Sequence, residues 1–256
     1  MSSKWLLSGV ALAMAMAFSA NVQADVTKTS LDLGYKFYTS DTKDDNPGVF
    51  NQPFLKLNHL GLADWGSYFA NIKLENPGEV AENQKNEDGK TTLKSLAIIE
   101  HKLGESGFNF WAQNFISASE TLVEDNLYLG VTHNSKFGDL ALNYGVGFNY
   151  TFGHFSPTDE NFNDISGYAL VLNAKYPLSF AGLKHNLSVN YEAQIDRDED
   201  HQKLFSYDSY GHQIILGWQT QFTDAFYGKL HLTQYDSWGA QYNDGIEYGL
   251  AFGYQF

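Results

Sequence analysis

The sequence predicts an all-β chain: a single transmembrane antiparallel β-barrel of about 12 strands, with short periplasmic turns and long acidic extracellular loops. Three observations predict this fold. Apolar and polar residues alternate with a period of two, the connections between alternating segments are short and long in turn, and the N-terminal segment has the form of an export signal. Such alternation is typical of strands that present one face to lipid and the other to a lumen.

The composition excludes several other classes of protein. The chain has 256 residues, no cysteine, and 16 Lys and Arg against 30 Asp and Glu, which gives a net charge of -14. The lack of cysteine excludes a disulfide scaffold, a thiolate metal site and a cysteine nucleophile. The acidic balance argues against a nucleic-acid partner, because nucleic-acid binding needs a basic face. Beyond the N-terminal segment, no apolar run is long enough for a membrane-spanning helix.

Residues 1–24 form the predicted signal peptide, and residues 25–256 form the predicted barrel. Lys4 precedes an apolar stretch over residues 5–18, and small residues surround position 23, which is the order found in secretory signals. A buried first helix is the alternative interpretation. Export together with the lack of cysteine favours the periplasm or outer membrane of a Gram-negative cell, where a free thiol would be oxidised.

The segment 140–152 shows the alternation clearly. Leu, Tyr, Val and Phe occupy its even positions, while Ala, Asn, Gly and Thr occupy its odd positions. Successive strand residues point to opposite sides, so one face is bulky and apolar. The alternative is a secreted soluble β-protein, which would bury that face. Segments of this kind predict twelve strands, at 26–38, 51–62, 66–75, 91–101, 107–114, 126–134, 140–152, 165–176, 185–196, 212–222, 225–235 and 245–256.

The connections between these segments alternate in length, as in outer-membrane barrels whose two chain ends both lie on the periplasmic side. We expect the short connections to be periplasmic: 63–65, 135–139 and 223–224. We expect the longer, polar and acidic connections to be extracellular: 39–50, 76–90, 115–125, 153–164, 197–211 and 236–244.

The last strand carries aromatic residues on one face and ends at Phe256. This ending resembles the signal read by outer-membrane assembly machinery, which is therefore an expected partner. The apolar outer face is expected to contact outer-membrane lipid and lipopolysaccharide. Tyrosine and tryptophan near strand ends are expected to form interfacial girdles: Trp65, Tyr68, Trp111, Tyr150, Tyr176, Tyr235 and Trp238.

Twelve strands predict a lumen of intermediate width, between barrels filled by side chains and open channels. Inward glycines such as Gly249 and Gly253 are expected to leave room beside charged and aromatic residues. The charges indicate either lumen solvation with cross-strand ion pairs or a path for solutes. The one arginine, Arg197, falls in a predicted loop, which argues against an anion channel. The candidate residues for a solute path are Lys36, Tyr38, Phe69, Lys73, Glu75, Glu192, Tyr227 and His231.

Three short motifs carry a resemblance to a known family. They are the Leu-x-x-x-Asp-Trp hairpin at 60–65, the following Tyr-Phe-Ala-Asn at 68–71, and the ending Tyr-Gly-Leu-Ala-Phe-Gly-Tyr-Gln-Phe at 248–256. With these motifs and its length, the chain resembles the nucleoside-specific channels of Gram-negative outer membranes, the Tsx-like family. The resemblance implies an outer-membrane channel through which small solutes, nucleosides above all, diffuse passively along a narrow lumen lined by aromatic and ionisable residues.

Two other classes of function stay open. A barrel without solute traffic would have a plugged lumen and acidic loops that serve as an adhesin or a phage receptor. An outer-membrane hydrolase would need a nucleophile and a base, for which His133 with Ser135, or His201 among acidic residues, are the candidates. We expect no enzyme, no metal and no cofactor, because metal-ligand spacings and phosphate-binding loops are absent from the sequence.

Overall fold

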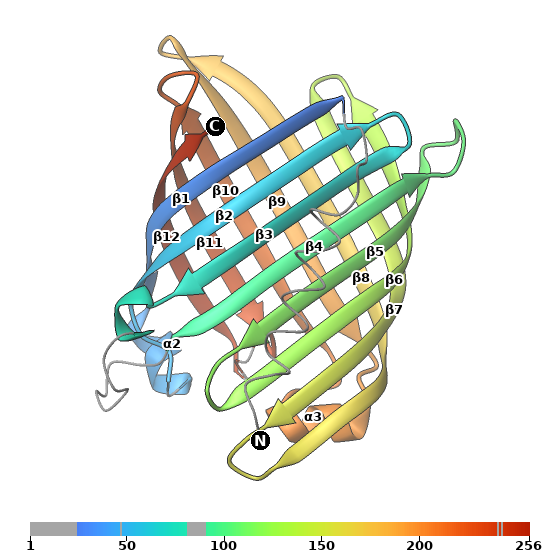
Figure 1. Cartoon of the computed structure of the whole chain (residues 1–256), viewed down its shortest axis with the longest axis vertical. Coiled ribbons are helices and arrows are strands. Elements are labelled where there is room, and N and C mark those ends of the chain that lie inside the picture. The colour runs from blue at the N-terminus through green and yellow to red at the C-terminus, as the bar shows by residue number, and fades with distance from the viewer. Residues whose placement is uncertain (1–24, 47, 81–90, 240, 242) are drawn as a thin grey trace.

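The computed structural model describes residues 25–46, 48–80, 91–239, 241 and 243–256, so the predicted signal peptide lies outside the described residues. Twelve antiparallel strands of this part of the chain form one closed barrel (Figure 1). Each strand pairs with its neighbours in the chain, and β1 pairs with β12 to close the sheet. The strands are β1 (Val26–Tyr38), β2 (Gln52–Ala63), β3 (Gly66–Glu75), β4 (Thr92–Lys102), β5 (Phe108–Ala118), β6 (Leu122–Phe137), β7 (Leu140–Phe155), β8 (Glu160–Phe180), β9 (Leu183–Ile195), β10 (Gly211–Gln221), β11 (Phe226–Asp236) and β12 (Gly245–Gln255).

The predicted number and order of strands are confirmed, but two predicted extracellular loops are wrong. The segments 115–125 and 153–164 contain only short turns, because β5, β6, β7 and β8 continue through most of them. Their polar residues led to the loop prediction. Inside a barrel such residues find partners, as the buried Glu124 does when its carboxylate accepts a hydrogen bond from Tyr207 Oη at 2.9 Å.

Short helices lie in the long extracellular loops, where α2 and α3 mark the lower end of Figure 1. The helix α2 (Ser40–Asp45) follows β1, the 3₁₀ helix η1 (Pro77–Val80) follows β3, and α3 (Glu199–Phe205) follows β9. Thr39 caps α2, since its hydroxyl accepts a hydrogen bond from the backbone N–H of Thr42 at 3.2 Å. No helix of the described residues is both long and apolar enough to cross a membrane.

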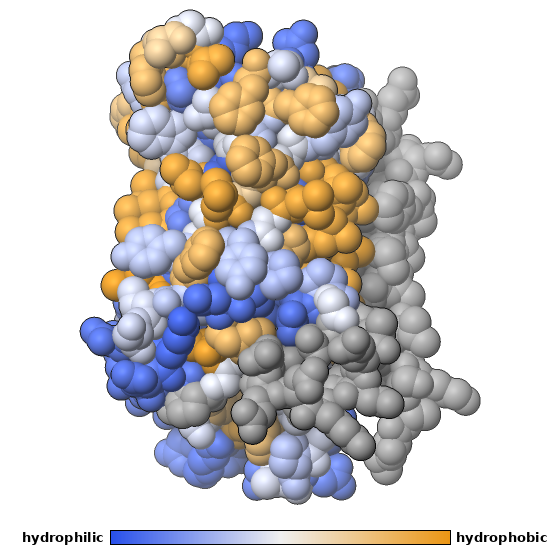
Figure 2. All heavy atoms as spheres, turned by 90° about the vertical axis from the view of Figure 1, so that its left-hand side faces the viewer, coloured by the Kyte–Doolittle hydropathy of each residue, from blue (hydrophilic) through white to orange (hydrophobic). Residues whose placement is uncertain are grey.

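The outer face of the barrel is apolar, as the alternation predicts. On β1 the side chain of Leu33 is 61% exposed, whereas the adjacent Asp32 is 3% exposed and faces the interior. Figure 2 shows apolar side chains over the middle of the wall and hydrophilic side chains gathered toward the end that carries α2. This apolar belt is the surface that contacts lipid.

The predicted aromatic girdle is confirmed only in part. Tyr150 and Tyr176 are exposed on the outer face, but Trp111, Tyr235 and Trp238 are buried inside the barrel. Trp111 packs against Tyr128, Ala169 and Val171 in an apolar cluster on β5, β6 and β8. Closeness to a strand end therefore does not decide which way a ring points, because the interior also buries rings where small residues face them.

The inward glycines of β12 do not leave open space, which corrects the expectation from the sequence. The ring of Tyr227 on β11 lies over Gly253, and the ring of His231 lies over Gly249, where a Cβ atom would overlap the ring atoms. The two glycines therefore let the rings of the neighbouring strand lie flat against the wall.

Because Gly253 has no side chain, residues of β11 reach across β12 to β1. Tyr227 donates a hydrogen bond to Asp32 at 2.6 Å, and Lys229 Nζ lies 2.9 Å from the other oxygen of the same carboxylate. We call this set the seam bridge. It joins two strands that are not neighbours in the sheet, at the seam where the barrel closes.

Candidate solute-binding site in the lumen

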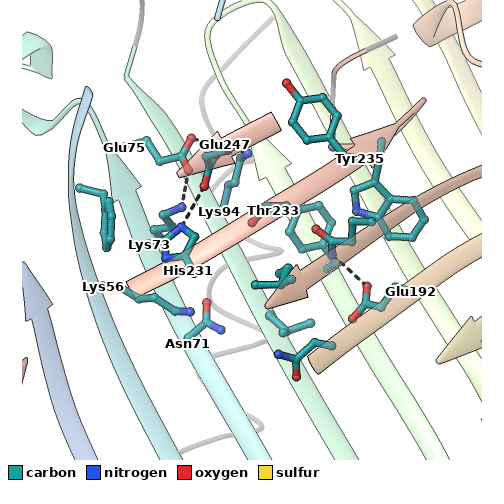
Figure 3. Close-up of a pocket in the computed structure, with 18 of the residues that line it drawn as sticks. Lys56, Asn71, Lys73, Glu75, Lys94, Glu192, His231, Thr233, Tyr235 and Glu247 are labelled. Atoms are coloured by element: carbon teal, nitrogen blue, oxygen red, sulfur yellow. Dashed lines mark hydrogen bonds and ion pairs between the residues drawn. The ribbon is translucent and has the colours of Figure 1, made fainter. Parts of the chain in front are cut away.

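A cavity of about 380 Å³ lies inside the barrel, lined mainly by β1–β4 and β9–β12. Figure 3 shows charged side chains that project into it from both walls. Trp238, Gly239 and Gln241 of the loop after β11 also line it, so it extends to the extracellular mouth. Its acidic, basic and histidine side chains are those of Asp32, Lys56, Lys73, Glu75, Lys94, Glu192, Lys229, His231 and Glu247.

Three lysines lie side by side on one wall of this cavity. Lys56 on β2 is directly opposite Lys73 on β3, and Lys73 is directly opposite Lys94 on β4. Residues in such positions have Cβ atoms about 4.5–5.5 Å apart, and like charges there repel one another. We call these three residues the lysine row (Figure 3).

Glu75 binds lysines from three strands. Its carboxylate oxygens lie 2.9 Å from Lys36 Nζ, 2.6 Å from Lys73 Nζ and 3.5 Å from Lys94 Nζ. Lys36 has a second partner in Glu247, at 3.2 Å. Since Glu75 and Lys36 are both buried, these charges are stabilised by one another rather than by water.

The opposite wall carries a carboxylate without a basic partner among the described residues. Glu192 lies on β9, which is six strands away from β3 in either direction around the closed sheet. Its two oxygens accept hydrogen bonds from Gln113 Nε2 at 3.1 Å and from Gln213 Nε2 at 3.4 Å. The cavity is therefore polarised, with cationic groups on one side and an amide-bound carboxylate on the other.

Four of the eight candidates for the solute path line this cavity: Lys73, Glu75, Glu192 and His231. On β11 and β12, His231 Nε2 lies 3.1 Å from a carboxylate oxygen of Glu247. The structure thus brings together acidic and basic groups that are far apart in the sequence.

The other four candidates are not among the residues that line the cavity. Lys36 and Tyr38 are buried near it, where Lys36 Nζ donates a hydrogen bond to Tyr38 Oη at 2.8 Å. Tyr227 belongs to the seam bridge. Phe69 lies opposite Ile98 in the sheet, and Ile98 packs against the apolar cluster around Trp111.

The solute-path candidates predicted from the sequence did not include Lys56, Lys94 or Glu247, although the alternation places Lys56 on the inner face. Lys94 lies in a segment whose alternation is weak, and Glu247 meets Lys36 only across the seam between β1 and β12. The signal that finds them is strand register, because it places Lys56 and Lys94 on either side of Lys73 and brings Glu247 beside Lys36 across the seam. Periodicity alone does not give register.

The hydrolase candidates lie apart from the cavity. Ser135 is on β6 rather than in the predicted turn, and its Oγ is 3.0 Å from His133 Nδ1. His133 contacts the rings of Phe108 and Tyr144, and none of the described carboxylates is bonded to it. The described residues also contain no group of three or more His, Asp or Glu side chains that could hold a metal ion.

The loop between β9 and β10 folds into the extracellular mouth. Arg197 in this loop is 3% exposed. Its guanidinium donates hydrogen bonds to Gln194 Oε1 and to the backbone carbonyl of Ser237, both at 2.7 Å. The loop is fixed further by an apolar cluster with β8: Phe162, Leu204, Phe205 and Tyr207.

His201 lies on α3, the helix within this loop, and its side chain is fully buried. Its Nδ1 is 2.6 Å from Ser166 Oγ, and its ring stacks on Phe162. Burial, and secondarily the nearby Arg197 charge, lowers the pKa of His201 to about 3. The imidazole is therefore neutral at physiological pH, and its burial leaves it closed to substrates.

We expect this histidine to make the protein less stable in acid. Unfolded chains take up a proton on histidine below pH of about 6.5, whereas folded His201 takes one up only near pH 3. The free energy of unfolding should fall by about 1.4 kcal/mol per pH unit between these values, or about 2 kcal/mol at pH 5. Urea titrations at neutral pH and at pH 5 measure this loss.

The matched variants are His201→Gln and His154→Gln. The first should remove this part of the pH dependence, and the second should keep it, because His154 is a half-buried residue near the rim of the barrel. Identical pH profiles for all three proteins would show that His201 does not determine acid stability.

The sequence matches a family model described as nucleoside-specific channel-forming protein, Tsx, over residues 33–256. The chain belongs to this family. The match extends from β1 to the last residue of the chain and confirms the resemblance noted in the sequence. No curated protein matches the chain.

Solved structures share the barrel architecture at low sequence identity. An outer-membrane channel from Pseudomonas putida F1 is 11% identical, with a TM-score of 0.53 over 92% of this chain and 98% of its own. A NanC porin is 10% identical, with a TM-score of 0.53 over 88% and 98%. The translocator domain of the autotransporter NalP from Neisseria meningitidis is 10% identical, with a TM-score of 0.50 over 97% and 95%. These identities show the fold alone.

The family and the closed barrel together establish the protein as an outer-membrane channel for small solutes. The predicted fold class, localisation and channel function are confirmed. The lumen cavity is the part of this Tsx-family channel where charged and apolar side chains line one space.

Proposed function

We propose that nucleosides cross the outer membrane by binding weakly in the lumen cavity, between the lysine row and Glu192. The observation that carries this proposal is the mixed lining of the cavity. Its volume of about 380 Å³ falls in the range of small-molecule sites, which combine apolar surface with a few placed polar groups.

The apolar lining suits the face of a nucleobase. Phe54 and Phe115 lie in the lining, together with Leu96 and Ile215. Aromatic rings stack on planar solutes in offset or edge-to-face arrangements. These rings replace Phe69 and Tyr227 as the proposed contacts of the base, while the latter two support the wall.

The polar lining suits the edges of the base and the sugar hydroxyls. Glu192 accepts hydrogen bonds, and Gln213 and Lys73 donate them. His231 on β11 lies beside Glu247 on β12. No step of catalysis belongs to this proposal, because a channel needs only binding that is weak enough for release.

We expect Glu192→Gln to weaken nucleoside binding by about tenfold, because a hydrogen bond to a charged acceptor contributes about 1.5–3 kcal/mol and a neutral amide accepts more weakly. Single-channel currents of the purified protein in a planar bilayer, titrated with adenosine, measure the concentration that blocks half of the current. Glu199→Gln on the exposed surface of α3 is the matched control and should block like wild type.

Two further variants locate the rings that matter. Phe115→Ala should weaken block by adenosine, whereas Phe69→Ala should not. A channel whose current adenosine leaves unchanged at every concentration would overturn the proposal, and equal effects of the two ring variants would remove the assignment of Phe115.

A further inference from the structure

We propose that the cavity also binds phosphate-bearing solutes, with the phosphate of a nucleoside monophosphate on the lysine row and its sugar and base toward Glu192. This inference rests on the proposed passage of nucleosides through the same cavity and names a further class of solute for it. The argument depends on the charges of the lining and on their positions in the sheet.

The lysine row has no counterpart in the rest of the lining. Lys56, Lys73 and Lys94 are directly opposed on three consecutive strands, in positions where like charges destabilise a sheet. Lys229, by contrast, lies 2.9 Å from Asp32 in a closed pair. A row of cations is unfavourable in the empty channel, and a bound dianion would relieve the repulsion.

The acidic groups near the row do not neutralise it. With Asp32, which lies directly opposite Lys56, and its partner Lys229 included, five positive charges face three negative charges, an excess of two; the groups counted are Lys36, Lys56, Lys73, Lys94 and Lys229 against Asp32, Glu75 and Glu247. Lys56 in particular forms no ion pair or hydrogen bond with any described residue, and it points into the cavity in Figure 3. A phosphate monoester carries close to two negative charges at neutral pH, which matches the excess.

The spacing of the row also suits a phosphate. Neighbouring lysines start from Cβ atoms about 4.5–5.5 Å apart, so two or three flexible ammonium groups can converge on one anion. Lysine binds phosphate as a point charge and needs no fixed fork geometry. The lack of an arginine in the strands, which argued against an anion channel, is therefore no obstacle to phosphate binding.

The opposite wall distinguishes a nucleotide from a simple anion. Glu192 repels a second negative group but accepts hydrogen bonds from sugar hydroxyls or an exocyclic amine. The rings of Phe54 and Phe115 belong to the same lining and can contact the base. A nucleoside monophosphate carries an anion at one end, and a planar ring and hydrogen-bond donors toward the other. These groups match the lysine row, the aromatic rings and Glu192 in turn.

Block of single-channel current by adenosine, adenosine monophosphate and inorganic phosphate tests the proposal at low ionic strength, where charges are least screened. In wild type, we expect the monophosphate to block at a concentration about tenfold lower than adenosine. In Lys56→Gln the ratio of the two blocking concentrations should fall to about one, and Lys56→Arg should restore it. Lys203→Gln, which removes a charge from the exposed face of α3, should keep the wild-type ratio.

The outcomes separate this inference from the proposed function. Block by adenosine with no advantage for the monophosphate, or an advantage that survives in Lys56→Gln, overturns the phosphate site and leaves nucleoside passage standing. Block by the monophosphate alone supports the phosphate site and overturns nucleoside binding. If inorganic phosphate blocks as well as the monophosphate does, the assignment to nucleotides is overturned. Circular dichroism of each variant confirms that its barrel is folded.

Discussion

Replacing Glu75 by glutamine is expected to lower the free energy of unfolding of the barrel by about 3–5 kcal/mol, the usual cost of removing one partner from a buried charge pair. Glu75 is 2% exposed and contacts Lys36, Lys73 and Lys94. Glutamine has nearly the same size but no charge, so the three ammonium groups would face one another around a neutral amide. Urea titration of the folded barrel in lipid vesicles measures the change.

Glu105→Gln is the matched control for this experiment. It makes the same chemical change in an exposed turn between β4 and β5 and should alter the free energy of unfolding by less than about 0.5 kcal/mol. Adding Lys36→Met to Glu75→Gln should recover part of the loss, because one of the uncompensated buried charges is removed. If Glu75→Gln and Glu105→Gln unfold at the same urea concentration, Glu75 is not the residue that holds these lysines together.

Trp111→Ala is expected to have a comparable cost, about 3–5 kcal/mol, and to raise the single-channel conductance. The indole is 1% exposed, lies 5.7 Å from the ring of Tyr128 between centroids, and packs against the backbone near Gly147. Removal of a large aromatic core side chain leaves a cavity whose surroundings relax only partly. Here that cavity would join the lumen, because the apolar cluster around Trp111 fills the side of the barrel opposite the seam.

The free energy of unfolding and the conductance of Trp111→Ala, measured on the same protein, distinguish a role in packing from a role in conduction. The control is a variant of the outer face. Phe252→Ala removes an aromatic ring that is 62% exposed on the outer face, so it should leave the conductance at the wild-type value whatever its effect on stability. A Trp111→Ala protein that is destabilised but conducts like wild type would show that the lumen narrows elsewhere.

Periodicity predicted the strands because each residue of a strand changes sides. Leu33 and Asp32 are adjacent in the sequence and lie on opposite faces of the wall, and the alternation shows this without any knowledge of neighbours. The prediction of long loops at 115–125 and 153–164 was wrong for a related reason. Glu124, one of the polar residues there, faces the lumen, where Asn126 and Tyr207 donate hydrogen bonds to its carboxylate.

The candidate site was harder to predict, because its members meet through register. Lys73 and Glu192 were found by their inward positions alone. Lys56 and Lys94 lie in strands on either side of Lys73, and nothing in the local sequence shows that the three form a row. Phe69 lies opposite Ile98, a neighbour of the apolar cluster, and does not line the cavity. Alternation gives the side of the wall on which a residue lies but not its depth along the lumen.

The seam bridge has a consequence for how the barrel is assembled. The first and last strands are far apart in the chain, so their pairing bears a large loop-closure cost and is prone to error. A slip by two residues keeps every side chain on its proper face, and apolar contacts alone would not reject it. A slip of β12 against β11 by two residues can bring Ala251 under the ring of Tyr227, where its methyl group would meet the ring. A slip of β12 against β1 would move Tyr227 away from Asp32 and break their hydrogen bond. Only the native register therefore places a glycine under the Tyr227 ring and Asp32 within its reach, so the glycines of the final strand favour correct closure of the sheet.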